Sequence, residues 1–183
     1  MGEVRYKAHP TSRWEIRKYA QQLRKVLGLE NAEYVDIVAL MEHVFPLLFG
    51  DDRFSLEIIE KERMGNNHGL TDPQNGKIYI REDVYEGACR GIGRDRLTMA
   101  HELGHFLIHK DVATGLARVG DGEKIPTYCD PEWQANAFAG EFLMGHEIIK
   151  NMSVKEIVQR CGVSYQAAGD RKSTRLNSSH YNM

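Results

Sequence analysis

The chain has 183 residues, of which 42% are apolar, so it suits one domain, with or without a small helical appendage, and can bury a core. Its 24 basic and 26 acidic residues nearly cancel, which excludes the strong field that captures nucleic acid without specificity, so direct nucleic-acid binding is not expected. The chain has no signal segment and no apolar run of roughly 20 residues, so it is expected to be cytoplasmic and to have no membrane partner. Its cysteines include no C-x-x-C pair, so they are expected to be reduced thiols.

Two helices are predicted in the N-terminal part, residues 1–50. The first begins with a capping-box pattern at Ser12 and shows apolar residues at helical spacing until Gly28. Asp36 can cap the second, and Pro46 is expected to end it. Both helices have one apolar face, so both should pack on the core.

A small sheet is predicted to open the next part, the peptidase-like core at 51–150. Runs rich in Ile, Leu, Phe and Tyr indicate strands at Phe54–Glu60 and Lys77–Glu82, with a further strand near Met64–Thr71. Asp72–Gly76 is a dense turn signal between the last two. We therefore expect an α+β fold with a mostly antiparallel sheet of about three strands packed on helices.

Three helices are expected after the sheet. A short one covers Asp83–Cys89 and a long one covers Arg94–Lys110, followed by a loop to Asp130. Asp130-Pro131 combines a capping side chain with a proline in the first turn, which predicts a helix that continues to about Met144.

The C-terminal end divides into two stretches. Residues 151–169 have the pattern of two short helices around a glycine, as in helix-turn-helix units. Asp170–His180 reads D-R-K-S-T-R-L-N-S-S-H, which matches one reading frame of a common sequencing adapter codon by codon. We therefore interpret 170–183 as an adapter artefact, exclude it from the fold prediction, and expect the natural C-terminus to be missing.

The pentapeptide H-E-L-G-H lies in the long predicted helix. His101 and His105 are four residues apart, so both imidazoles project from one face and can bind one metal ion, while Glu102 is placed to act as general base toward an activated water. The helix is otherwise apolar nearly all round, so these polar groups are costly unless a metal or hydrogen bonds satisfy them. Gly104 is unfavourable in a helix interior, which suggests that another backbone passes close by. Zinc-dependent hydrolysis is therefore the leading hypothesis, and two hydrogen-bonded histidines in a helix are the alternative.

Catalytic zinc usually takes three protein ligands and leaves one position open, so a third is required. The metzincin pattern would place a glycine at position 108 and a ligand at 111, but the chain has Ile108 and Asp111 there. Glu132, in the first turn of the helix that starts at Asp130, is the leading candidate. Asn136 lies one turn later on the same face, where it can hydrogen-bond a ligand.

Other assignments stay open at this point. A carboxylate at a helix N-terminus is also stabilised there without a metal, which is the alternative role for Glu132. His109, four residues after His105, is interpreted as a packed histidine or one that hydrogen-bonds a ligand, with direct metal ligation as the lesser alternative. The lesser ligand candidates are Asp130, Glu141, His146 and Cys129.

Two blocks of the sequence carry a family resemblance. The first runs from Gly91 through H-E-L-G-H to His109, and the second is E-W-Q-A-N-A-F-A-G-E-F-L-M at Glu132–Met144. Together they resemble the ImmA/IrrE family of gluzincin-like metallopeptidases, and a weaker resemblance covers most of residues 12–168. This chain has Gly145 where the family commonly has proline, a departure that removes no ligand.

The resemblance implies a complete site and a class of substrate. By position, His101, His105 and Glu132 would bind one Zn2+ ion, with Mn2+ or another divalent ion as the alternative, and Glu102 would be catalytic. Family members typically cleave or inactivate a helix-turn-helix transcriptional repressor, often encoded beside them on mobile elements or in stress-response loci. We therefore expect a protein substrate of this kind, and the strand at Lys77–Glu82 is a candidate to pair with it if it lies at a sheet edge.

Two other classes of function compete with the peptidase. The helix pair in residues 151–169 would suit a DNA-binding regulator, although it has few basic residues. A metal-binding protein without hydrolysis, such as one member of a toxin-antitoxin-like pair, would keep the metal ligands and have no need of Glu102.

Overall fold

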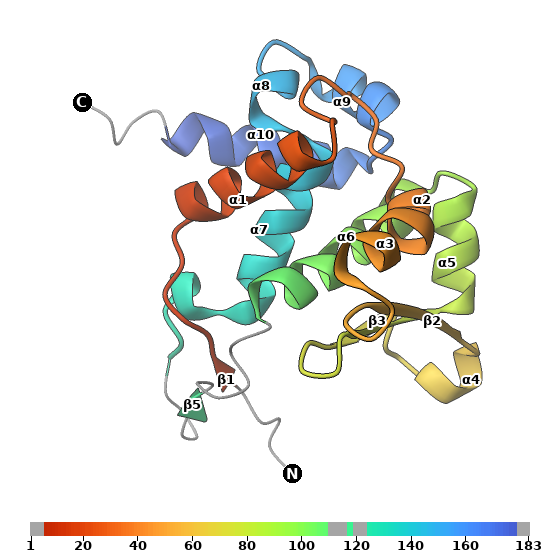
Figure 1. Ribbon diagram of the computed structural model, residues 1–183. Helices are drawn as coiled ribbons and strands as arrows, with labels where there is room; N and C mark the ends of the chain where they lie inside the picture. The colour runs from red at the N-terminus through yellow and green to blue at the C-terminus, as the bar shows by residue number, and fades with distance from the viewer. Residues whose placement is uncertain (1–5, 110–116, 119–123, 179–183) are drawn as a thin grey trace.

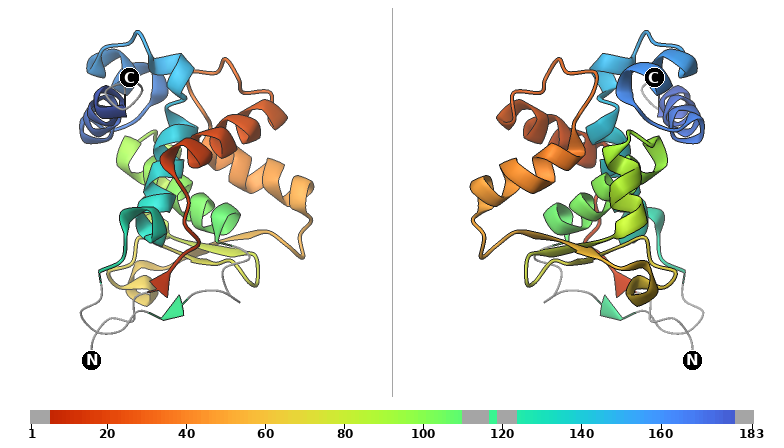
Figure 2. Two further views of the ribbon diagram at one scale, coloured as in Figure 1. Left: turned by 90° about the vertical axis from the view of Figure 1, so that its left-hand side faces the viewer. Right: turned by 90° about the vertical axis from the view of Figure 1, so that its right-hand side faces the viewer.

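The computed structural model describes residues 6–109, 117–118 and 124–178, and within them the protein is α+β, as predicted. A three-stranded sheet lies at one end, helices pack over it, and α8–α10 form the opposite end (Figures 1 and 2). Lys110, the expected end of the long helix, and much of the predicted loop to Asp130 lie outside the described residues.

The N-terminal segment begins with β1 (Tyr6–Lys7), which pairs antiparallel with β5 (Ala117–Arg118). Helix α1 (Arg13–Val26) follows with the predicted capping box, in which Ser12 accepts from the Glu15 backbone N–H and Glu15 accepts from that of Ser12. Its buried face packs on α7.

The second predicted helix continues past its expected end. Asp36 caps α2 (Ile37–Ala39), a π-helical turn follows at Leu40–Val44, and α3 (Phe45–Phe49) completes the segment. The prediction that Pro46 ends the helix is wrong. Pro46 occupies the first turn of α3, where a missing backbone N–H costs little.

The sheet contains β2 (Ser55–Ile59), β3 (Gly69–Asp72) and β4 (Lys77–Arg81) in the order β2-β4-β3. The pair β3-β4 is antiparallel, but β2-β4 is parallel, so the sheet is mixed rather than mostly antiparallel. Helix α4 (Lys61–Met64) and β3 lie between β2 and β4 and give the chain enough length to return in the same direction. Among the strands of the described residues, β4 is therefore central, and β2 and β3 are the edge strands.

Two long helices span the centre of the protein. After α5 (Glu82–Cys89), α6 (Gly93–Ile108) packs on β3, β4 and α7 (Pro131–Leu143), which is preceded by the 3-10 turn Thr127–Cys129. Asp130 caps α7 as predicted. One hydrophobic cluster joins the sheet, α6 and α7 and includes residues of α1 and α3.

The C-terminal helices follow the predicted pattern. After α8 (His146–Ile149), a capping box at Ser153 starts α9 (Val154–Cys161), Gly162 ends it in the left-handed conformation, and α10 (Tyr165–Ser178) follows. Helix α10 includes residues 170–178. This does not test whether an adapter encodes these residues, because their charged and polar side chains are compatible with a helix. Their assignment to an adapter stays a prediction.

Among the helices of the described residues, none is both long enough and apolar enough to cross a membrane.

A buried arginine fixes the site helix α6 to two other segments. Arg96 is 1% exposed and donates to the backbone carbonyls of Val35, Cys161 and Gly162. Its guanidinium also lies 3.9 Å from the centre of the Tyr34 ring. A Cβ at Gly162 would collide with this guanidinium, so the glycine serves both the left-handed backbone and the close approach of Arg96.

We expect Arg96→Met to lower the free energy of unfolding by about 3 kcal/mol, because it removes the buried guanidinium that donates to three carbonyls. Arg160→Met is the matched control, since Arg160 makes a surface ion pair with Glu33 at 2.9 Å and should change stability by less than about 1 kcal/mol. Denaturant titration measures both. Equal effects of the two substitutions would contradict the assigned role of Arg96.

Candidate metal centre

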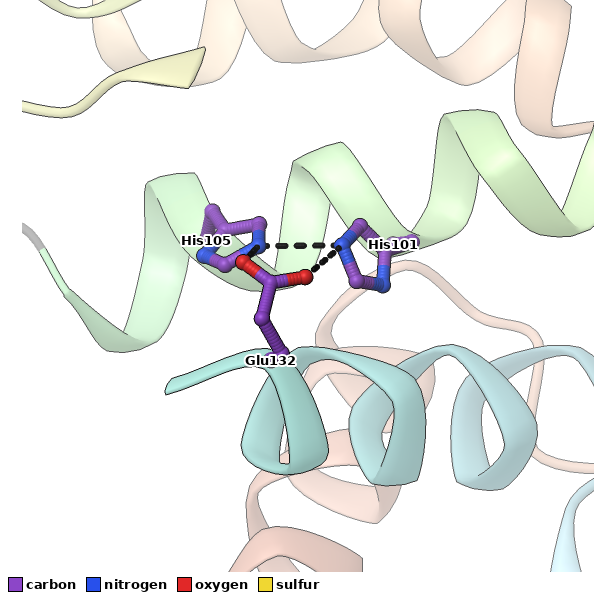
Figure 3. A group of neighbouring side chains, drawn as sticks. All are labelled: His101, His105 and Glu132. Atoms are coloured by element: carbon purple, nitrogen blue, oxygen red, sulfur yellow. Dashed lines mark hydrogen bonds and ion pairs between the residues drawn. The ribbon is translucent and has the colours of Figure 1, made fainter. Parts of the chain in front are cut away.

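Helix α6 presents two imidazoles to the start of α7. His101 and His105 are one turn apart, and their Nε2 atoms are separated by 3.0 Å (Figure 3). Each side chain is 16% exposed, so both rings lie mostly within the protein and reach solvent at one edge. The spacing in the sequence thus produces the expected convergence on one face of the helix.

The third group comes from the first turn of α7. Asp130 accepts from the backbone N–H of Glu132 at 3.0 Å, which orients this turn. Glu132 Oε2 lies 3.2 Å from His101 Nε2, and Oε1 lies 3.3 Å from His105 Nε2. Among the described residues, these three side chains form the group whose ligand atoms lie within 4.8 Å of one another.

The two helices can approach this closely because of Gly104. A Cβ at this position would lie 3.2 Å from both Cα and O of Ala135 and 3.1 Å from the Phe138 ring. The backbone of α7 therefore passes directly against α6, as the glycine suggested. This contact sets Glu132 opposite the histidine pair.

The far nitrogens of both imidazoles are also held. His101 Nδ1 lies 3.0 Å from Asn136 Oδ1, and His105 Nδ1 lies 2.9 Å from His109 Nδ1. Since an amide oxygen only accepts, His101 Nδ1 donates to Asn136, and the Nε2 of the neutral ring is left with a free lone pair. Asn136 and His109 thus contact the Nδ1 atoms of the two histidines, while the Nε2 atoms face Glu132.

The arrangement of these atoms fits a cation. Two imidazole nitrogens and a carboxylate converge, and this group is satisfied by a proton or a metal ion between them. Burial lowers the pKa of His101, but the hydrogen bond to Glu132 and the charges of Glu102 and Glu132 outweigh it and raise the pKa overall. The adjacent imidazoles of His101 and His105 hold the pKa of Glu132 well below its usual range. Two nitrogens and one carboxylate are also a ligand set of catalytic zinc sites.

Strand β3 holds the carboxylate of Glu102, which is 7% exposed. Thr71 donates its hydroxyl to Glu102 Oε2 at 2.7 Å. A Cβ at Gly69 would lie 2.6 Å from both Oε1 and Cγ of Glu102, so the glycine makes room for this side chain. No motif in the sequence pointed to a chemical role for Thr71 or Gly69, which lie within the strand predicted near Met64–Thr71.

A surface depression lies beside strand β3 and His105. A depression of about 370 Å³ borders β3 and the site, and its lining includes Leu70, Thr71, Asp72, His105, His109 and Pro131. A chain segment lying along β3 would therefore reach His105.

The lesser ligand candidates lie in other environments. Glu141 is buried and forms ion pairs with Arg17 at 3.2 Å and Arg13 at 3.6 Å. Asp130 caps α7, and His146 contacts Glu147 at 2.9 Å. Cys129 is buried and does not belong to the three-residue group, so the structure gives none of the four a place there.

Comparisons with known proteins identify the family of the chain. The family described as the IrrE N-terminal-like domain, a peptidase family, matches residues 59–173. A solved structure described as a Mycobacterium tuberculosis transcriptional regulator is similar with a TM-score of 0.56 at 15% identity, over 84% of this chain and 45% of that one. This likeness shows a shared fold over less than half of the regulator. No curated protein matches the chain closely.

We expect Zn2+ to raise the melting temperature of chelator-treated protein by about 5–10 °C at a hundredfold excess over the dissociation constant, because the ion binds only the folded state. Glu132→Ala should remove most of this shift. Glu147→Ala, which alters an exposed glutamate on α8, is the control and should keep it. Equal zinc-induced shifts in wild type and Glu132→Ala would contradict the assignment of Glu132.

Proposed function

Because the chain belongs to the family of the IrrE N-terminal-like domain and is thereby a protein of metallopeptidase type, we propose that it is a zinc-dependent endopeptidase acting on a protein. The observation that carries the proposal is the convergence of His101, His105 and Glu132 beside a held Glu102. The four residues supply three metal ligands and one general base. This set is sufficient for hydrolysis of an amide.

The residues divide the work as follows. His101 Nε2, His105 Nε2 and the Glu132 carboxylate would hold the ion, which when bound supplies Lewis-acid chemistry by lowering the pKa of a water and polarising a carbonyl. Thr71 occupies Oε2 of Glu102, so we assign Oε1 to receive the proton of the attacking water. Glu102 then passes this proton to the leaving amine. Gly69 and Thr71 keep the carboxylate in place for both transfers.

The proposed substrate binds as an extended segment along β3. This strand is a sheet edge, its Leu70 side chain is 52% exposed, and its Thr71 touches the general base. An edge strand presents unpaired backbone groups, to which an extended peptide can add as a further strand. The sequence suggested that the strand at Lys77–Glu82 pairs with the substrate. Because this strand corresponds to β4 and is central in the sheet, we assign substrate pairing to β3 instead.

We further propose that the substrate is a helix-turn-helix transcriptional repressor. Support comes from membership of the family together with an edge strand that requires an extended, accessible segment in the target. Such a segment occurs between folded parts of a regulator more readily than within one.

A DNA-binding role has less support in the structure. The predicted pair exists as α9 and α10, but Lys155 and Arg160 are the basic residues of α9, and Arg160 is paired with Glu33. Ile157 and Cys161 face the core. A gel shift that is salt-sensitive and independent of zinc would favour DNA binding over hydrolysis.

We expect Glu102→Gln to keep zinc binding and to slow cleavage by about 10²–10⁴-fold, because it removes the proton acceptor. The measurement combines metal analysis with incubation of the repressor encoded beside the gene, followed by mass spectrometry of the products. Glu147→Gln is the control and should cleave at the wild-type rate. Absence of any cut by zinc-loaded wild type, or an unchanged rate in Glu102→Gln, would refute the peptidase and favour a non-hydrolytic metal-binding protein.

We expect Gly69→Ala to reduce kcat by about 100-fold while zinc affinity is retained, because the new Cβ would displace Glu102 from a position 2.6 Å away. Gly169→Ala, which meets no atom within 4 Å, is the matched control. Steady-state kinetics on a cleavable peptide would separate kcat from KM. A change confined to KM would show that Gly69 serves substrate binding instead.

A further inference from the structure

A buried glutamine lies behind the candidate metal centre. Gln134 is 0% exposed and follows Glu132 by two residues in α7. Its Nε2 lies 2.8 Å from both the His9 and the Tyr128 backbone carbonyl oxygens. Only an NH2 group can donate to two carbonyls, so these contacts fix the orientation of the amide and turn Oε1 to the other side.

The amide oxygen sets the hydrogen positions of a buried histidine. Gln134 Oε1 lies 2.9 Å from His109 Nε2, and because this oxygen only accepts, Nε2 carries the hydrogen. His109 is 6% exposed, and in the neutral form of its ring only one of the two nitrogens carries a hydrogen. The Nδ1 of His109 then has no hydrogen and acts as an acceptor.

The same reasoning extends to the candidate ligand. His105 Nδ1 lies 2.9 Å from His109 Nδ1, so His105 Nδ1 must carry the hydrogen of this bond. In a neutral imidazole only one nitrogen is protonated, which leaves His105 Nε2 with a free lone pair. This is the atom that lies 3.3 Å from Glu132 Oε1.

We propose that Gln134 and His109 are positioning residues that hold His105 in the tautomer whose Nε2 can bind metal, an inference that rests on the proposed metal site. Hydrogen-bond partners of ligating histidines commonly fix both the tautomer and the ring orientation. Here Gln134 orients His109, and His109 in turn orients His105. The orientation of Gln134 is itself set by the backbone carbonyls of His9 and Tyr128.

These carbonyls belong to two segments that are bonded to each other. Ala8 N–H donates to Cys129 O, and Thr11 N–H donates to Tyr128 O, each at 2.8 Å. The N-terminal segment therefore lies against the 3-10 turn before α7, and both contribute a carbonyl to Gln134. The position of residues 8–11 therefore influences which nitrogen of His105 carries the hydrogen.

The first test reads the tautomers in the metal-free, full-length wild-type protein. With 15N-labelled histidine, long-range 1H–15N correlation spectra near pH 7 distinguish a hydrogen on Nδ1 from one on Nε2. We expect His105 to carry it on Nδ1 and His109 on Nε2. A hydrogen on Nε2 of His105 would overturn the proposal without recourse to any variant.

The second test removes each member of the series. His109→Phe and Gln134→Met should reduce the Nδ1–H population of His105 and weaken Zn2+ binding by about 10- to 100-fold in a chelator competition. His43→Phe and Gln22→Met are the matched controls, because they make the same chemical changes at exposed positions. Wild-type affinity and an unchanged His105 tautomer in both test variants would overturn the proposal.

Failure of this inference is distinguishable from failure of the proposed function. A zinc-loaded protein that cleaves its substrate while His105 carries its hydrogen on Nε2 in the metal-free state refutes the series alone. A protein with the expected tautomers and zinc affinity that cleaves nothing refutes the peptidase and leaves the positioning roles intact. Circular dichroism of each variant shows whether the variant is folded. If a variant is unfolded, the histidine tautomers in the NMR spectrum of the wild type decide the question.

Discussion

The contact between α6 and α7 is the constraint on which the rest of the structure depends. At Gly104 the two backbones are close enough that a single Cβ would lie 3.2 Å from Ala135 Cα and O. This separation brings the first turn of α7 within reach of imidazoles that project from α6. Even an added Cβ at this point would require the neighbouring atoms of α7 to give by a few tenths of an ångström, which would shift Glu132 relative to His101 and His105.

The parts of the site that the sequence predicted are those set by local geometry. The spacing of His101 and His105 fixes a common helix face, and Asp130-Pro131 fixes the helix start that carries Glu132. Asn136 follows from the same helical repeat. None of these positions requires knowledge of the strands, so a single sequence was enough to indicate them.

The parts that could not be predicted depend on segments far apart in the chain. Thr71 and Glu102 are separated by 31 residues, and no periodic pattern connects them. Gln134 is oriented by backbone carbonyls, which are present at every residue and have no signature in the sequence. The parallel pairing of β2 with β4 likewise depended on how the intervening α4 and β3 fold, and Pro46 was tolerated because a π-helical turn precedes it.

The three converging groups differ in their access to water. The histidine side chains are each 16% exposed and rooted in a helix whose inner face is core, whereas the Glu132 side chain is 67% exposed at the outer end of α7. An ion held there would therefore be enclosed on the side of the core and would face solvent on the side of Glu132. Entry and exit of the ion would then run past Glu132 and would leave the packed core intact.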